Sequence, residues 1–466
     1  KINNKLKVSD FYINSKINID KIFYKQDNLD MKIIFPSHKK TIELKDHEIE
    51  LEFDKSNLSL KGKGKFLIDK KFDSINYDIR SDNKDINFAT NINLKNTPIN
   101  FKLLNFKKNN KENAELNING VYYKNKFIKI NKFSFKESKN IFFIEDLNLN
   151  SEYKFNSVKI IKLDFNNQKN KHNKISLIKN KKNYKLEGSS FDATVLIDEL
   201  LEADNNDTIS IFNKLDSNLK INIDKTHIDD VSYVNNLNGN IEFLNSKIEK
   251  LNLQSNFPNN QKMTLTINRN KNNEKVTTLH SSYPKPLVKR YKFIKGYEEG
   301  VLDFYSTKKN NISRSVLKID NFKVKEVPAL AKLLSLASLQ GIADLATGEG
   351  IRFNEFDMFF ENSKNLIKIN EIYALGPAIS ILMEGYVEKN NLVSLRGTLV
   401  PATTINKTIS KIPLVGDILV GKKMGEGVFG VSFKIKGPPD GLETRVNPIK
   451  TLTPRFITRT LDKIKK

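Results

Sequence analysis

The sequence has no cysteine and no tryptophan, and its 466 residues include no long hydrophobic run. The lack of cysteine excludes disulfides, a cysteine nucleophile and a thiolate metal site. A helix that spans a membrane needs about 20 consecutive apolar residues. The nearest candidate, Ile412 to Val420, is much shorter and contains Asp417. The sequence therefore contains no candidate for a membrane-spanning helix.

Hydrophobic residues make up 38% of the chain, which is low for a compact globule but too high for disorder. This composition indicates a protein with a large surface for its volume. The net charge of +24 suits an anionic partner, either nucleic acid or a lipid surface. The lysines lie in turns and at alternate positions of predicted strands, so a solvated basic surface is the simpler interpretation.

Apolar and polar residues alternate from Lys1 to about Ile319, with Lys/Asn-rich turns between the alternating segments. Successive side chains of a strand point to opposite faces, so each segment has one apolar face. This pattern predicts a mainly β protein with a long antiparallel meander of about 25 strands. Four helices are expected in addition, at 192–203, 285–294, 328–345 and 448–464.

So few helices cannot cover so many strands. We therefore expect one long, twisted antiparallel sheet, bent into an elongated trough whose apolar groove is wide enough for acyl chains, with a few short helices near its C-terminal end. The residues expected to line the groove are Ile86, Phe88, Ile92, Leu94, Leu116, Ile118, Leu219, Ile221, Ile223, Leu265 and Ile267.

No motif indicates catalysis, a metal or a cofactor. Gly425, Gly427 and Gly430 match a nucleotide-binding loop, but a predicted strand at 431–436 follows them where that loop requires a helix. The five histidines are scattered and lack the spacing of metal ligands. Adjacent carboxylates such as Asp229 and Asp230 would face opposite sides of a strand, so they do not form an acid/base pair.

The last third of the chain is apolar and punctuated by glycine and proline. Its segments "LLSLASLQGIADLATGEGIRF", "LGPAISILMEGYV", "LRGTLVPA", "IPLVGDILVG" and "KGPPDGLETRVNP" occur in this order from Leu333 to Pro448. In order and spacing they resemble the AsmA-like C-terminal region of the AsmA, YhdP and TamB group of Gram-negative envelope proteins. The positions that carry the resemblance are Pro328, Leu333, Leu334, Gly341, Gly376, Pro377, Gly397, Pro401, Pro413, Gly416, Gly421, Gly437, Pro438, Asn447 and Pro448.

This resemblance implies a non-enzymatic periplasmic protein that carries phospholipids between the inner and outer membranes. A charge in the groove, as in Ile221→Asp, is then expected to block lipid transfer and to leave the fold intact. The resemblance implies an AsmA-like region at 296–466, and the alternating pattern of 1–295 assigns that part to a repetitive β-groove segment. It also implies an inner-membrane anchor, which we expect upstream of Lys1, and possible contacts with envelope proteins at either end. No cofactor and no nucleic acid are expected as partners.

Two alternatives remain open at this stage. An envelope assembly factor would use exposed strand edges to help outer-membrane proteins insert, as the resemblance to TamB implies. A basic nucleic-acid-binding protein would account for the net charge and for the many phenylalanines and tyrosines.

Overall fold

The computed structural model describes residues 12–25, 34–36, 38, 41–55, 57–82, 84–124, 126–202, 216–289, 295–326, 328–336, 348–388, 391–401, 430–438 and 441–449. In this part of the chain, 25 strands belong to one open, mixed sheet, and there are three short α-helices. The mainly β class, the long sheet and the expected number of strands are confirmed. The chain forms two compact units, Lys1–Leu251 and Asn252–Lys466. The predicted division at 295/296 concerns the family motifs and stays a prediction.

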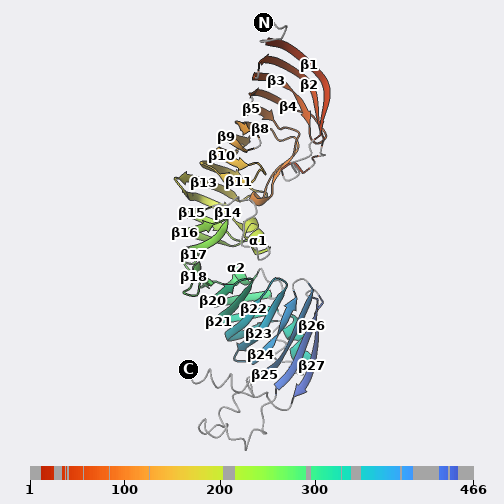
Figure 1. Ribbon diagram of the computed structural model, residues 1–466. Coiled ribbons are helices and arrows are strands. Elements are labelled where there is room, and N and C mark those ends of the chain that lie inside the picture. The colour runs from red at the N-terminus through yellow and green to blue at the C-terminus, as the bar shows by residue number, and fades with distance from the viewer. Residues whose placement is uncertain are drawn as a thin grey trace, which may run out of the picture. The chain divides into compact units, whose positions relative to one another are not determined.

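The strands of the first unit follow one another in chain order (Figure 1). They are β1 (Tyr12–Lys25), β2 (Thr41–Asp54), β3 (Asn57–Leu67), β4 (Asp73–Ser81), β5 (Asp85–Asn93), β6 (Ile99–Phe101), β7 (Phe106–Lys108), β8 (Ala114–Tyr123), β9 (Phe127–Glu137), β10 (Asn140–Asn150), β11 (Phe155–Ser157), β12 (Ile160–Asn166), β13 (His172–Asn180), β14 (Asn183–Asp192), β15 (Ser217–His227) and β16 (Tyr233–Leu244). The next strand, β17 (Lys247–Asn256), contains the boundary between the units.

One pair of strands departs from the predicted antiparallel meander. β14 and β15 are parallel, and the connection between them contains the helix α1 (Thr194–Glu202). A parallel pair cannot be joined by a tight hairpin, because the chain must return to the starting end of the sheet. The helix predicted at 192–203 is thus confirmed, and the parallel pairing that it produces was missed.

A second unexpected feature is the segment 94–113 between β5 and β8, which we call the strap. It contains the separate two-stranded sheet of β6 and β7 and the 3-10 turn η2 (Lys102–Leu104). Its apolar residues Leu94, Ile99 and Phe106 are at most 2% exposed, and they pack with residues of the main sheet such as Phe135 and Phe142. The strap therefore covers part of one face of the sheet.

Two buried charged side chains hold the strap. The Asp73 carboxylate accepts hydrogen bonds from the backbone amides of Asn96 and Thr97, each at 2.8 Å. The Lys108 ammonium, which is fully buried, donates to the carbonyls of Thr97 at 2.9 Å and Asn109 at 3.0 Å. Burial lowers the pKa of Lys108, and the charge of Asp73 opposes this effect. Both charges are thus satisfied chiefly by the strap's own backbone.

The second unit continues with antiparallel strands (Figure 1). They are β18 (Lys262–Arg269), β19 (Lys275–Ser281), β20 (Lys295–Lys309), β21 (Ile312–Glu326), β22 (Ile351–Asn362), β23 (Leu366–Leu375), β24 (Ile379–Glu388), β25 (Leu392–Pro401), β26 (Gly430–Gly437) and β27 (Glu443–Ile449). The helices α2 (Lys285–Val288) and α3 (Pro328–Leu336) belong to this unit. Val288 and Leu334, one from each helix, pack into its largest core cluster beside Phe322, Phe353 and Ile379.

The predicted helices of the last third agree with the structure only in part. The helix at 328–345 is confirmed up to Leu336, and 337–345 lies outside the described residues. The helix at 285–294 is a single turn, Lys285–Val288. The helix at 448–464 is wrong at its start, because Pro448 and Ile449 extend β27 and pair with Val431 and Gly430. The rest of that segment is outside the described residues.

Candidate functional site

An uninterrupted row of apolar side chains crosses the first unit from strand to strand. Residues that are directly opposite each other in neighbouring strands point to the same face. One such row runs through seven strands from β8 to β15 without a polar residue. It consists of Ile118, Phe133, Ile144, Ile161, Leu177, Leu186 and Ile221, each paired with the next.

The strap divides this apolar face into a covered part and an uncovered part. The row beside the strap contains Leu116, Phe135, Phe142 and Leu163, all at most 9% exposed. The next row lies two residues further along each strand, away from the strap. In this row every residue from Ile118 to Leu186 is only half-buried. Further from the strap, Ile79, Phe88, Ile130 and Leu147 are half-buried as well. The uncovered part is therefore an apolar surface that extends across many strands, a feature typical of a binding site.

The eleven residues predicted to line a groove all lie on apolar faces of strands or directly beside one. Ile86, Phe88 and Ile92 of β5 lie opposite Tyr122, Gly120 and Leu116 of β8. Leu94 belongs to the strap and is 1% exposed, and Leu116, Ile221 and Ile223 are at most 7% exposed, so these four belong to the core. The remaining residues, which are half-buried, are Ile86, Phe88, Ile92, Ile118, Leu219, Leu265 and Ile267. Leu265 and Ile267 lie in the second unit, where Leu265 pairs with Leu279.

A polar pair interrupts the apolar face near its first strands. The His47 ring is 3% exposed and contacts the Tyr77 hydroxyl through Nδ1 at 3.1 Å, while Nε2 donates to the Lys65 carbonyl at 3.0 Å. These rings occupy the space above two glycines, since a Cβ on Gly62 or Gly64 would come within 2.4 Å of them. Burial raises the pKa of Tyr77. Both ring nitrogens of His47 have partners, so the pair fills space and is not a free binding group.

A buried polar network fixes the connection to α1. The Asp192 carboxylate accepts hydrogen bonds from Thr194 Oγ1 at 2.5 Å and from Asn167 Nδ2 at 2.7 Å, and Lys171 Nζ is 3.5 Å away. Burial raises the pKa of Asp192, but the hydrogen bonds from Thr194 and Asn167 and the charge of Lys171 outweigh it, so the pKa is lowered. The network positions the helix and leaves no acceptor of Asp192 pointing into solvent.

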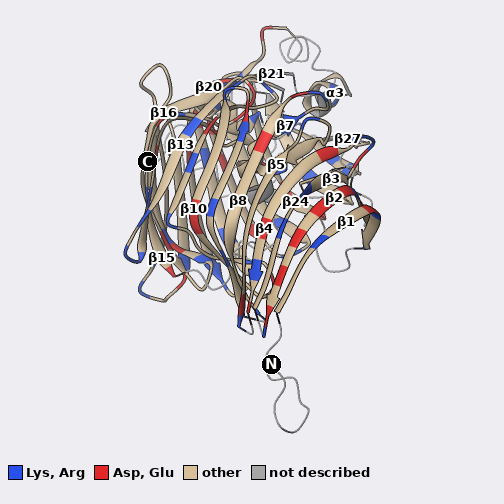
Figure 2. Cartoon of the chain, turned by 90° about the horizontal axis from the view of Figure 1, so that it is seen from above, with Lys and Arg blue, Asp and Glu red and all other residues tan. Residues whose placement is uncertain are grey.

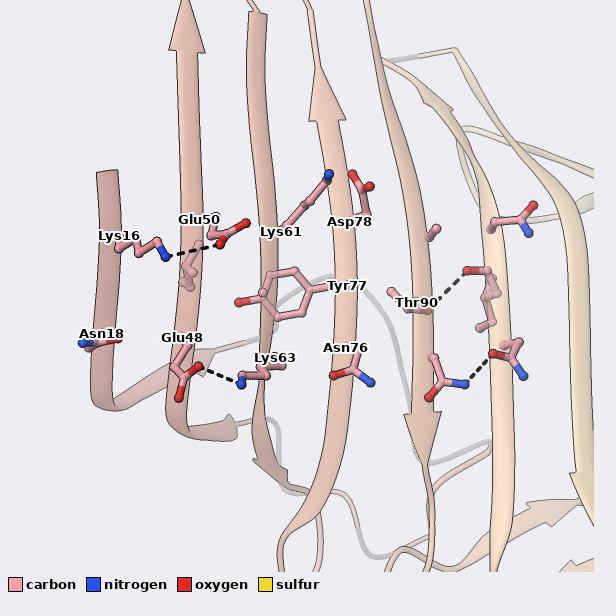
Figure 3. Close-up of a pocket in the computed structure, with 17 residues that line it drawn as sticks. Lys16, Asn18, Glu48, Glu50, Lys61, Lys63, Asn76, Tyr77, Asp78 and Thr90 are labelled. Atoms are coloured by element: carbon pink, nitrogen blue, oxygen red, sulfur yellow. Dashed lines mark hydrogen bonds and ion pairs between the residues drawn. The ribbon is translucent and has the colours of Figure 1, made fainter. Parts of the chain in front are cut away.

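The polar face of strands β1 to β8 carries a hollow of ≈ 690 Å³ (Figure 3). Its polar side chains alternate with residues of the apolar face, such as Ile49 and Tyr77. Lys16 pairs with Glu50 at 3.8 Å, and Lys63 pairs with Glu48 at 2.9 Å. The three lysines in the lining are matched by three carboxylates, so the hollow has no excess charge. This surface is a set of exposed ion pairs and amides.

The motif residues of the last third have structural positions wherever they are described. Gly376 and Pro377 form the turn between β23 and β24, and Gly437 and Pro438 end β26. Leu334 is fully buried in the core. The other described positions lie in elements: Pro328 and Leu333 in α3, Gly397 and Pro401 in β25, Asn447 and Pro448 in β27. Gly341, Pro413, Gly416, Gly421, Gly425 and Gly427 lie outside the described residues.

The histidines are structural where they have partners. His172 and His280 each lie 2.8 Å from a carboxylate oxygen, of Asp164 and Asp303 respectively. In the described part of the chain, no three His, Asp or Glu side chains gather where they could hold a metal ion. The described helices include none long and apolar enough to span a membrane.

The features that sequence reasoning missed are the strap and the charge pattern on the polar face. The strap's residues are Lys- and Asn-rich, so they resemble an ordinary turn, and only its buried Phe106 and Ile99 distinguish it. In comparisons with known proteins, no family model, curated protein or solved structure matches this chain.

Proposed function

We propose that the chain is a non-enzymatic lipid-transfer protein that carries phospholipids along its apolar sheet face. The observation that supports this most strongly is the uncovered, half-buried apolar surface that crosses the strands of the first unit in unbroken rows. An apolar surface of this extent on a folded chain needs an apolar partner. The acyl chains of lipids can be this apolar partner, and they do not require a specific binding site.

The energetics favour a conduit over a tight binding site. Burial of apolar surface is worth about 25 cal/mol per Å², or ~0.8 kcal/mol for each CH₂ group. Half-buried side chains of similar type follow one another along the row from Ile118 to Leu186, so a lipid tail gains nearly the same energy at each strand. Nearly equal binding energies give low barriers between positions, and low barriers permit movement along the sheet.

The cellular compartment in this proposal is inferred from the resemblance of the last third of the chain to the AsmA-like C-terminal region. We propose that the protein works in the periplasm between the inner and outer membranes, anchored to the inner membrane. The described motif residues of this region lie at turns, in strands and in α3, and Leu334 is in the core, which fits a structural role for them.

The test is mass spectrometry of lipids extracted from gently purified, folded protein. We expect phospholipids to copurify, and the delipidated chain to take up phospholipid from vesicles. A folded chain that carries no lipid and takes up none from vesicles would exclude the proposal.

A further inference from the structure

The first strand of the sheet, β1, is an exposed edge with an apolar face. None of its 14 residues is buried, and its large hydrophobic residues Ile13 and Ile17 are 45% and 36% exposed. On one side β1 pairs with β2 along its whole length. No other strand in the described part of the chain pairs with it. Among the described strands, its second edge is therefore left for a further strand to pair with through backbone amides and carbonyls.

The apolar face of the sheet continues to this edge. Ile13 lies opposite Phe53, Ile17 opposite Ile49, and Ile22 opposite Leu44. Natural edge strands are usually short or carry proline, a bulge or an inward-pointing charge that discourages pairing. β1 is long and has no proline, and the left-handed residue that marks a bulge, Asp46 at φ 53°, lies in β2. A strand added to β1 would therefore prolong the apolar face.

The charges on the polar face of the sheet determine which charge a strand added to β1 should carry. The first three strands alternate in charge: β1 is basic, β2 is acidic and β3 is basic (Figure 2). Ion pairs join them, Lys16 to Glu50 between β1 and β2, and Lys63 to Glu48 between β3 and β2. The charged residues are Lys16, Lys21 and Lys25 on β1, Glu43, Asp46, Glu48, Glu50, Glu52 and Asp54 on β2, and Lys61, Lys63 and Lys65 on β3, with Asp20 and Lys45 of opposite sign.

We infer that β1 is a docking edge for an extended segment of a partner protein, in which apolar residues alternate with acidic ones. Cross-strand pairs of opposite charge stabilise a sheet, and like charges directly opposite each other destabilise it. An acidic strand would continue the alternation at β1, and its apolar residues would lie beside Ile13 and Ile17. A second copy of β1 fits less well, because it would bring lysines against lysines in several registers. The inference does not depend on lipid transfer.

Synthetic peptides test the inference on the full chain. A peptide of about ten residues, a common strand length, in which Val alternates with Glu, is expected to bind β1. Binding should slow hydrogen exchange of the β1 amides that point away from β2 by about tenfold when the edge is ~90% occupied. A peptide in which Val alternates with Lys should leave exchange unchanged. Added salt should weaken the binding of the Val/Glu peptide, because the charges are exposed.

A charge exchange on β1 provides the decisive variant. Lys16→Glu with Lys21→Glu should reverse the preference, so that the Val/Lys peptide binds and the Val/Glu peptide does not. The variant removes two ion pairs, Lys16–Glu50 and Lys21–Glu43, in which both lysines are more than half exposed, so their loss should leave the fold intact, which circular dichroism checks. Lys154→Glu with Lys250→Glu is the matched control, because it makes the same change of charge in two other exposed ion pairs, and it should bind as the unmodified chain does.

Three results would overturn the inference. The first is that neither peptide protects β1, and the second is that the charge exchange does not change the preference. The third is that the β1 amides on the edge away from β2 are already protected in the chain alone, by a second copy or by another part of the chain. Sedimentation would show a second copy as a dimer.

Discussion

A single charge on the uncovered apolar face should stop lipid movement and spare the fold. Leu177 in β13 is suited to this test because it is half-buried and lies in the middle of the apolar row, between Ile161 and Leu186. Ile221, which the sequence pattern favours, is less suitable. It is 7% exposed, so an aspartate there would be expected to unfold the sheet locally.

The expected magnitudes for Leu177→Asp separate transport from stability. Full burial of a leucine side chain is worth about 1.5–3 kcal/mol, so loss of the half-buried Leu177 should cost about 1 kcal/mol of folding free energy. The introduced carboxylate keeps its water while the groove is empty. It would have to lose that water as a lipid tail crosses it, at a cost of about 3 kcal/mol, which slows transfer about a hundredfold.

The next residue along the same strand supplies the control. Ile178 is aliphatic and 40% exposed, and it points to the opposite face, where it pairs with Lys185. Ile178→Asp therefore introduces the same charge into the same strand with a similar effect on stability. The assay is transfer of a fluorescent phospholipid between donor and acceptor vesicles, with thermal unfolding measured on both variants.

We expect Leu177→Asp to lose transfer and Ile178→Asp to retain it, with midpoints of unfolding that differ by a few degrees at most. Equal transfer by the two folded variants would refute the assignment of the apolar face as the lipid path. Equal loss in both would show that charge anywhere on β13 disturbs transfer, and it would refute the assignment of a single face.

Two further predictions concern the elements that hold the sheet. Phe135→Ala should lower the free energy of unfolding by about 3–5 kcal/mol in chemical denaturation, because its ring is fully buried under the strap, whereas removal of the half-buried Phe143 should cost less. Asp192→Asn should remove part of the acid sensitivity of the first unit. Since the folded pKa of Asp192 is lowered, its contribution is present above about pH 4 and is lost as the pH falls through the folded value. An unchanged pH profile of unfolding in the variant would contradict this.

Much of the fold could be predicted because alternation is a local property. Each segment such as Leu219 to Ile223 shows its apolar face without reference to its neighbours, and Asp192 marks the start of α1 in the same way. The number of strands follows from the spacing of turns. The bulge at Asp46 and the parallel pair β14–β15 depend on pairing between strands, so no local pattern predicts them.

The candidate site was less predictable, because burial depends on what lies above each residue. Ile92 and Leu94 have the same place in the alternation, yet Leu94, the first residue of the strap, is 1% exposed and Ile92 is only half-buried. The charge order of β1, β2 and β3 is visible in the sequence but has no meaning until the strands are known to be neighbours. Pro448 is typical of a helix start in the sequence, and its pairing with Val431 places it in a strand.

The order in which the strands pair has a consequence for folding and for how the length of the sheet can evolve. Almost every strand pairs with the strands next to it in the chain, from the hairpin of β3 and β4 to that of β26 and β27. Such a protein is nearly one-dimensional: its stability is close to a sum of hairpins and their nearest-neighbour contacts. Hairpins can be gained or lost by duplication or deletion without disturbing distant strands. The distance that the sheet spans can therefore change by small steps, while the local rules that form it stay the same.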